Sequence, residues 1–98
     1  MGWATFYIEA LKRGETVKFR PRGNSMTGRV ESGQLVTVEP VNLEDVRVDD
    51  VVLCKVKGNE YLHLVGAVDS GRVQIQNNKG FVNGWTRFVY GRLVKVEP

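Results

Sequence analysis

The sequence predicts a mostly β, compact antiparallel domain with one short helix at its N-terminus. From residue 16 onward, short apolar or alternating segments are separated by turns that contain Gly, Asn, Asp or Pro. Residues 1–14 instead have apolar residues at helical spacing. The 98 residues are the length of one domain, and no repeat or linker divides them. We therefore expect a single domain over residues 1–98, with a helix in 1–14 and a β core over 15–98.

The first segment is typical of an amphipathic helix. Its apolar stripe consists of Trp3, Phe6, Tyr7, Ala10 and Leu11. Lys12 and Arg13 suit the negative end of the helix dipole, and Gly14 is a natural stop. We expect the stripe to pack on the sheet of the same domain. A membrane-binding helix is the alternative, but Glu9 and only two basic residues make a poor membrane face.

The strands are expected to follow one another with short connections. Their predicted positions are residues 16–20, 34–39, 51–56, 61–68, 72–75 and 90–96. Lys57-Gly58-Asn59 and Asp69-Ser70-Gly71 predict hairpin turns between three of them. Residues 76–84 are rich in Asn and Gly and predict a polar loop.

The composition argues against several classes of protein. Hydrophobic residues make up 42% of the chain, which is ordinary for a globular domain and argues against disorder. A single cysteine, Cys54, and a single histidine, His63, argue against a zinc site, and we expect no metal and no cofactor. No apolar run approaches the roughly 20 residues of a membrane span, and no signal-peptide pattern is visible. We expect a cytoplasmic protein without a membrane anchor.

The candidate site consists of a serine on a turn and the histidine of a later strand. Ser25 lies in the Gly-punctuated sequence Gly23-Asn24-Ser25-Met26, and His63 lies in the apolar segment 60–65. A serine needs a nearby base to act as a nucleophile at neutral pH, and a neutral imidazole is the usual one. The alternatives are a turn serine that satisfies backbone groups and a half-buried strand histidine with one hydrogen-bond partner.

A series of short motifs gives this pair a context. The motifs are Gly-Asn-Ser-Met at 23–26, Gly-Gln-Leu-Val at 33–36, Asp-Asp-Val-Val at 49–52, Tyr-Leu-His-Leu at 61–64, Gln-Asn-Asn-Lys-Gly at 76–80 and Tyr-Gly-Arg-Leu-Val at 90–94. In this order they resemble the LexA-like and signal-peptidase-like serine peptidases. The resemblance implies that family's β-fold, with Ser25 as the nucleophile and His63 as the general base. It also implies a nucleophile turn that includes Gly23, Asn24 and Met26, where backbone N–H groups can form an oxyanion hole.

The sequence departs from this family at supporting positions. The histidine branch of the family carries a late Asp that orients the imidazole, whereas no Asp follows Asp69 here. The residue after the base is usually Arg and is Leu64 in this chain. Lys55 and Lys79 are alternative bases. An amide can orient a histidine but cannot stabilise an imidazolium as a carboxylate does. The candidates for this orienting role are Asn77, Asn78 and Asn83.

Three functions remain open from the sequence. The first is a serine-type peptidase that binds an unknown protein or peptide as an extended strand beside Ser25. The second is an inactive module that keeps the fold and binds a peptide or protein partner. The third is a nucleic-acid-binding β-domain, which the net charge of +3 permits but does not require. That third function would use the basic cluster Lys18, Arg20, Arg22 and Arg29. Phe81, Trp85 and Phe88, with Arg87, could stack a base or could instead line a peptide groove.

Overall fold

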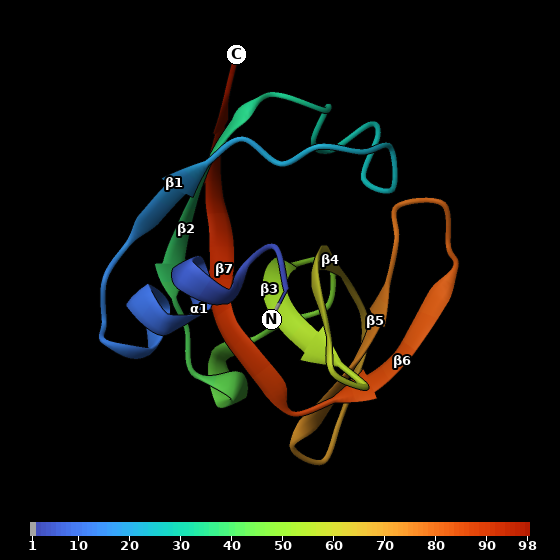
Figure 1. Ribbon diagram of the computed structural model, residues 1–98. Coiled ribbons are helices and arrows are strands. Elements are labelled where there is room, and N and C mark those ends of the chain that lie inside the picture. The colour runs from blue at the N-terminus through green and yellow to red at the C-terminus, as the bar shows by residue number, and fades with distance from the viewer. Residues whose placement is uncertain (1) are drawn as a thin grey trace.

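The computed structural model describes residues 2–98, and most of this part of the chain forms one antiparallel sheet (Figure 1). Seven strands are found within residues 2–98, in the spatial order β1-β2-β7-β3-β4-β5-β6. Their bounds are β1 (Val17–Phe19), β2 (Leu35–Pro40), β3 (Val51–Val56), β4 (Asn59–Asp69), β5 (Arg72–Gln76), β6 (Val82–Thr86) and β7 (Phe88–Glu97). The helix α1 (Thr5–Lys12) precedes the sheet, and a short 3₁₀ turn, η1 (Leu43–Asp45), follows β2. The mostly β, antiparallel fold class with an N-terminal helix is thereby confirmed.

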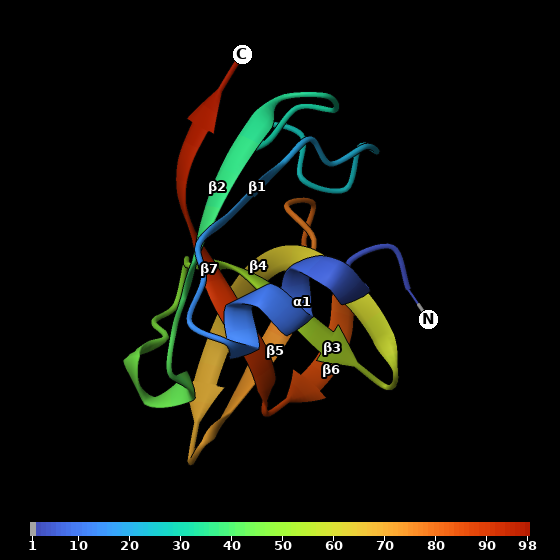
Figure 2. The same ribbon diagram turned by 60° about the vertical axis from the view of Figure 1, so that its left-hand side comes forward.

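Helix α1 packs on the sheet against β1, β2 and β7 (Figure 2). Its buried face is centred on Ala4, Ile8 and Leu11, which recur at helical spacing. The predicted apolar stripe is wrong at Phe6, which is 80% exposed, and at Trp3, which is 52% exposed and precedes the helix. Phe6 lies about 200° around the helix from Ile8, so the two residues cannot face the same neighbour.

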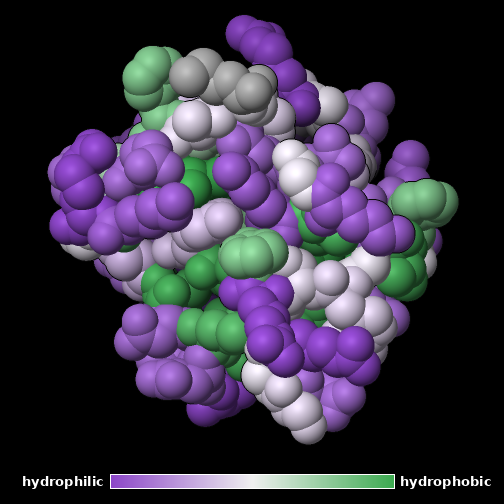
Figure 3. All heavy atoms as spheres, turned by 60° about the horizontal axis from the view of Figure 1, so that its bottom comes forward, coloured by the Kyte–Doolittle hydropathy of each residue, from purple (hydrophilic) through white to green (hydrophobic). Residues whose placement is uncertain are grey.

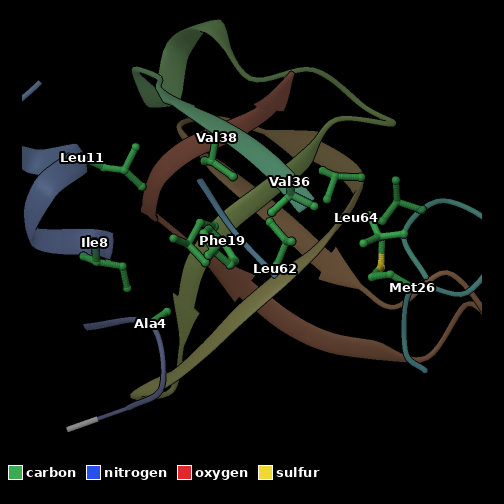
Figure 4. Packing of buried hydrophobic residues seen from close by; sticks show 12 residues of the cluster. Ala4, Ile8, Leu11, Phe19, Met26, Val36, Val38, Leu62 and Leu64 are labelled. Atoms are coloured by element: carbon green, nitrogen blue, oxygen red, sulfur yellow. The ribbon is translucent and has the colours of Figure 1, made fainter. Parts of the chain in front are cut away.

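Two clusters of buried apolar side chains lie on the two faces of the central strands. Residues of β3 alternate between them: Leu53 belongs to the cluster beneath α1, and Cys54 belongs to the other. Figure 4 shows the cluster beneath α1, in which helix residues lie at one end and Met26 lies beside Leu64 at the other. Met26 is 5% exposed. The residue after Ser25 is therefore anchored in the core.

The predicted loop over residues 76–84 is wrong in its second half, because β6 begins at Val82 and pairs with β5. Asn83 and Gly84 obscure the alternation typical of a strand, and pairing with a neighbour overrides such weak local preferences. Ile75 pairs with Gly84 and Gln76 pairs with Val82, so Asn83 is the extra residue of a β-bulge. The other predicted strands are present, with ends that differ by one or two residues at most.

The exposed apolar side chains do not form one continuous surface on the face that Figure 3 shows, where small hydrophobic groups lie between hydrophilic ones. Scattered apolar side chains of this kind are normal for a folded domain. Within residues 2–98, α1 is the sole α-helix, and it lacks the length and the apolar character needed to cross a bilayer.

Glu60 fastens the start of α1 to β4. Its side chain lies in the interior, with 8% of the residue exposed. The atom Oε1 accepts a hydrogen bond from the Ala4 N–H at 2.6 Å, and Oε2 accepts one from the Thr5 hydroxyl at 2.7 Å. The helix has no capping side chain of its own. Ala4 is the N-cap residue of α1, so a carboxylate from a distant strand accepts from the N-cap N–H, as the Glu or Gln of a capping box does.

Replacing Glu60 by alanine is expected to lower the free energy of unfolding by about 2 kcal/mol, because the buried Ala4 N–H and the half-buried Thr5 hydroxyl would lose their acceptors. Urea denaturation followed by tryptophan fluorescence measures this loss. Glu39→Ala is the matched control, since Glu39 is an exposed glutamate of β2. A loss at Glu60 no larger than the loss at Glu39 would contradict the role of the carboxylate.

Candidate active site

Ser25 lies on an exposed turn in the segment that joins β1 to β2. Gly23 and Gly28 have φ angles of 119° and 101°, which side-chain-bearing residues rarely adopt. The Val30 N–H donates to the Met26 carbonyl oxygen at 2.8 Å and closes the turn behind the serine. Because Met26 and Val30 are both buried, the backbone on the C-terminal side of Ser25 is anchored in the core, while Ser25 itself is exposed.

The serine turn is tied to the loop between β5 and β6 by Asn78. The Asn78 N–H donates to the Ser25 carbonyl oxygen at 2.8 Å, and its Nδ2 donates to the Thr27 carbonyl oxygen at 2.8 Å. Its Oδ1 accepts from Arg29 Nε at 2.7 Å. Both ribbon views show the two segments side by side (Figures 1 and 2). Asn78 therefore positions the serine turn relative to the sheet.

His63 contacts both Ser25 and Asn83. Its Nε2 lies 3.1 Å from Ser25 Oγ, and its Nδ1 lies 2.7 Å from Asn83 Oδ1. A carboxamide oxygen can only accept a hydrogen bond, so the neutral ring carries its hydrogen on Nδ1. The lone pair of Nε2 then faces the serine hydroxyl. The geometry is that of a nucleophile, a base and an orienting group in series.

The three asparagines that the sequence offers as orienting residues lie in different environments. Asn83 alone contacts His63 within the described residues, because the bulge in β6 turns its side chain toward β4. Asn78 instead holds the serine turn. Asn77 Oδ1 accepts from the N–H groups of Lys79 and Phe81, at 2.8 and 2.9 Å, and so orders its own loop. Across residues 2–98, neither Lys55 nor Lys79 makes a hydrogen bond to Ser25.

The surroundings of His63 keep its imidazole neutral. Burial lowers the pKa of His63 below its ordinary value of 6.5, and the hydrogen bond to Asn83 opposes part of that shift. Tyr61 lies two residues earlier on β4 and stacks on the ring, with the centroids 4.7 Å apart. At neutral pH the ring is therefore in the form that can accept a proton.

The amides of the serine turn are available to a ligand. The backbone N–H groups of Asn24, Ser25 and Met26 donate to no acceptor within residues 2–98. The Gly23 N–H differs, since it donates to Ser32 Oγ at 3.2 Å and thus shapes the turn. Unpaired N–H groups beside a nucleophile are the donors from which an oxyanion hole is made.

A cleft of about 630 Å³ opens beside Ser25 and His63. Its walls include Trp3, Tyr7, Phe19, Arg20, Arg22 and Leu62. Sequence reasoning assigned Trp3 and Tyr7 to the packed face of a helix and did not connect them with the serine. Trp3 and Tyr7 come from the N-terminal segment and Phe19 comes from β1, so the pattern within either segment alone could not show that the three rings line one cleft.

The remaining candidate groups lie outside this site. Burial raises the pKa of the Cys54 thiol to about 12, which makes it a poor nucleophile. Trp85 packs against the guanidinium of Arg72, 4.5 Å from its ring centroid, and Arg29 lies 3.8 Å from Asp49. No cluster of three or more His, Cys, Asp or Glu side chains suited to a metal ion occurs among residues 2–98.

Comparisons with known proteins give no match, either to a protein-family model or to a curated protein sequence. The resemblance to LexA-like and signal-peptidase-like peptidases therefore rests on the order of the motifs alone.

Proposed function

We propose that this protein is a serine-type peptidase of the LexA-like and signal-peptidase-like kind, with Ser25 as the nucleophile. The observation that carries the proposal is the chain of contacts from Ser25 Oγ to His63 Nε2, at 3.1 Å, and from His63 Nδ1 to Asn83 Oδ1, at 2.7 Å. Such a series converts a weakly nucleophilic hydroxyl into one that can attack a carbonyl carbon.

In the proposed reaction, His63 Nε2 takes the hydroxyl proton while Ser25 Oγ bonds to the carbonyl carbon of a peptide. The C–N bond then breaks as the imidazolium gives that proton to the departing amine, which leaves an acyl ester on Ser25. Water, deprotonated by the same imidazole, then attacks the ester carbon. The bond from that carbon to Ser25 Oγ breaks as the imidazolium returns the proton to Oγ, and the carboxylic acid product leaves. Each attack on a carbonyl carbon forms a tetrahedral intermediate with a negatively charged oxygen. The free N–H groups at Ser25 and its neighbours support the proposal, since they can stabilise that oxygen in both steps.

The substrate in this proposal is a protein or peptide in extended conformation. Strand β1 is an edge of the sheet and pairs with β2 on one side. Its other side can accept an added strand, and the chain continues from β1 toward Ser25. A peptide bound along β1 would reach the cleft in which Ser25 and His63 lie.

An inactive module that binds a peptide or protein is the second candidate. It is favoured by one observation, which is that Asn83 rather than a carboxylate faces His63. An amide leaves the imidazolium uncompensated. For this reason we expect the peptidase, if the first proposal holds, to turn over slowly.

Labelling by a fluorophosphonate tests the proposal. The wild-type protein is expected to form a covalent adduct, and Ser25→Ala is expected to form none, because the phosphonate bonds to the activated hydroxyl. Ser70→Ala is the matched control, since Ser70 lies in the turn between β4 and β5 and should leave labelling unchanged. Mass spectrometry of the intact protein reads the adduct. A wild-type protein that stays unlabelled would favour the inactive module.

A further inference from the structure

The cleft beside Ser25 has an aromatic wall built from the N-terminal segment and β1. The ring of Tyr7 stacks on Phe19 with centroids 4.3 Å apart, and the Trp3 ring lies 5.7 Å from Phe19. Trp3 is nevertheless 52% exposed. The three rings therefore pack on one another, and Phe19 is buried behind Trp3 and Tyr7, which leave apolar surface free in the cleft. A wall of this kind gains more from a large apolar side chain than from a small one.

The wall is fixed before any ligand binds. Trp3 Nε1 donates to the Glu60 carbonyl oxygen at 3.1 Å, and the Glu60 carboxylate holds the next two residues of the chain. The indole thus has a hydrogen bond at its polar edge and a packed ring on one side. Because these groups are already ordered, binding to them costs little conformational entropy.

The charge at the cleft is positive. Arg20 and Arg22 both line it and both are exposed. Arg20 donates one hydrogen bond to the Gly33 carbonyl oxygen, at 2.9 Å, and Arg22 forms no salt bridge within residues 2–98. The one acidic lining residue, Glu60, has both carboxylate oxygens engaged with α1. The free charge at the cleft can therefore attract an acidic group.

We infer that the site selects a peptide with a large apolar side chain, such as Phe, close to the reactive bond and with an acidic residue near it. The apolar side chain lies against the wall of Trp3 and Tyr7, and the carboxylate faces Arg20 and Arg22. This inference rests on the proposed peptidase function and names the substrate class of that same site.

Three end-blocked peptides of one length test it. They are identical except for two neighbouring positions, which carry Phe and Asp, Ala and Asp, or Phe and Lys. Calorimetry measures their binding to Ser25→Ala, which cannot cleave them, and mass spectrometry measures their cleavage by the wild-type protein. We expect the Phe–Asp peptide to bind about tenfold or more tightly than the other two. We also expect it to have the highest kcat/KM.

Further substitutions in the Ser25→Ala protein test which residues cause the preference for Phe over Ala and the preference for Asp over Lys. Trp3→Ala is expected to weaken binding of the Phe–Asp peptide about tenfold. Phe6→Ala should leave binding unchanged, since Phe6 lies on the exposed side of α1 and does not line the cleft. Arg22→Gln should reduce the preference for Asp over Lys. Arg87→Gln makes the same charge change outside the cleft and should preserve that preference.

The outcomes that would contradict the inference differ from those that would contradict the peptidase proposal. Equal binding of the Phe–Asp and Ala–Asp peptides, or a preference for Phe that survives Trp3→Ala, would overturn the inference. Preferential cleavage of the Ala–Asp peptide would also overturn it and would support the peptidase proposal. Selective binding of the Phe–Asp peptide without cleavage of any peptide would support the inference and contradict the peptidase proposal.

Discussion

The variant His63→Ala is expected to react with a fluorophosphonate about a thousandfold more slowly than the wild-type protein. His63 Nε2 lies 3.1 Å from Ser25 Oγ, and general-base catalysis by a positioned side chain contributes roughly 10² to 10⁴ in rate. Stopped-time labelling with detection by mass spectrometry gives the rate for each protein.

Two controls separate loss of the base from loss of structure. Added imidazole should restore part of the rate in His63→Ala, because the free base can enter the space that the side chain leaves. Lys79→Ala removes an exposed amine near the site and should keep the wild-type rate. Unchanged labelling of His63→Ala would show that another group activates Ser25.

Exchange of Asn83 for Asp is expected to raise the pKa of His63 and to increase the labelling rate. The wild-type rate should rise with pH as the imidazole loses its proton, with a midpoint below 6.5, because burial lowers the pKa of His63. A carboxylate 2.7 Å from Nδ1 favours the charged ring, so the midpoint should move to higher pH. The same carboxylate stabilises the imidazolium that forms as Ser25 attacks, and this effect raises the rate.

The single histidine of the chain makes this prediction direct to measure by proton NMR titration. Asn77→Asp is the matched control. Its Oδ1 accepts two backbone hydrogen bonds that a carboxylate can also accept, and it does not contact His63. A His63 pKa that is the same in Asn83→Asp and the wild-type protein would contradict the contact between residues 63 and 83.

The fold was predictable where one residue pattern decides the structure. The apolar run of β3 and the Lys57-Gly58-Asn59 turn predict a buried strand and a hairpin, and the structure confirms them. Strand β6 was not predictable, because Asn83 and Gly84 become part of a strand through pairing with β5. The buried face of α1 was partly missed, since Ile8 is buried and Phe6 is not. A helix of eight residues fits more than one apolar stripe.

The candidate site was predictable in its residues and not in its contacts. The motif order singled out Ser25 and His63, and the structure places them within hydrogen-bond distance. Three asparagines were candidates for the orienting group, and only the register of β6 distinguishes Asn83 from the others. The role of Glu60 had one signal in the sequence, which is a charged residue at the start of an otherwise apolar strand segment. Its burial is seen in the structure alone.

The order of the strands has a consequence for protein synthesis. Strand β7 lies between β2 and β3, and Asn83 reaches His63 from β6, near the end of the sequence. Contacts between such distant residues form late, and the N-terminal part of a polypeptide leaves the ribosome first. A nascent chain that already exposes Ser25 therefore has neither an oriented base nor a complete sheet. The contacts from Ser25 to His63 and from His63 to Asn83 are therefore complete only once β4 and β6 are in place.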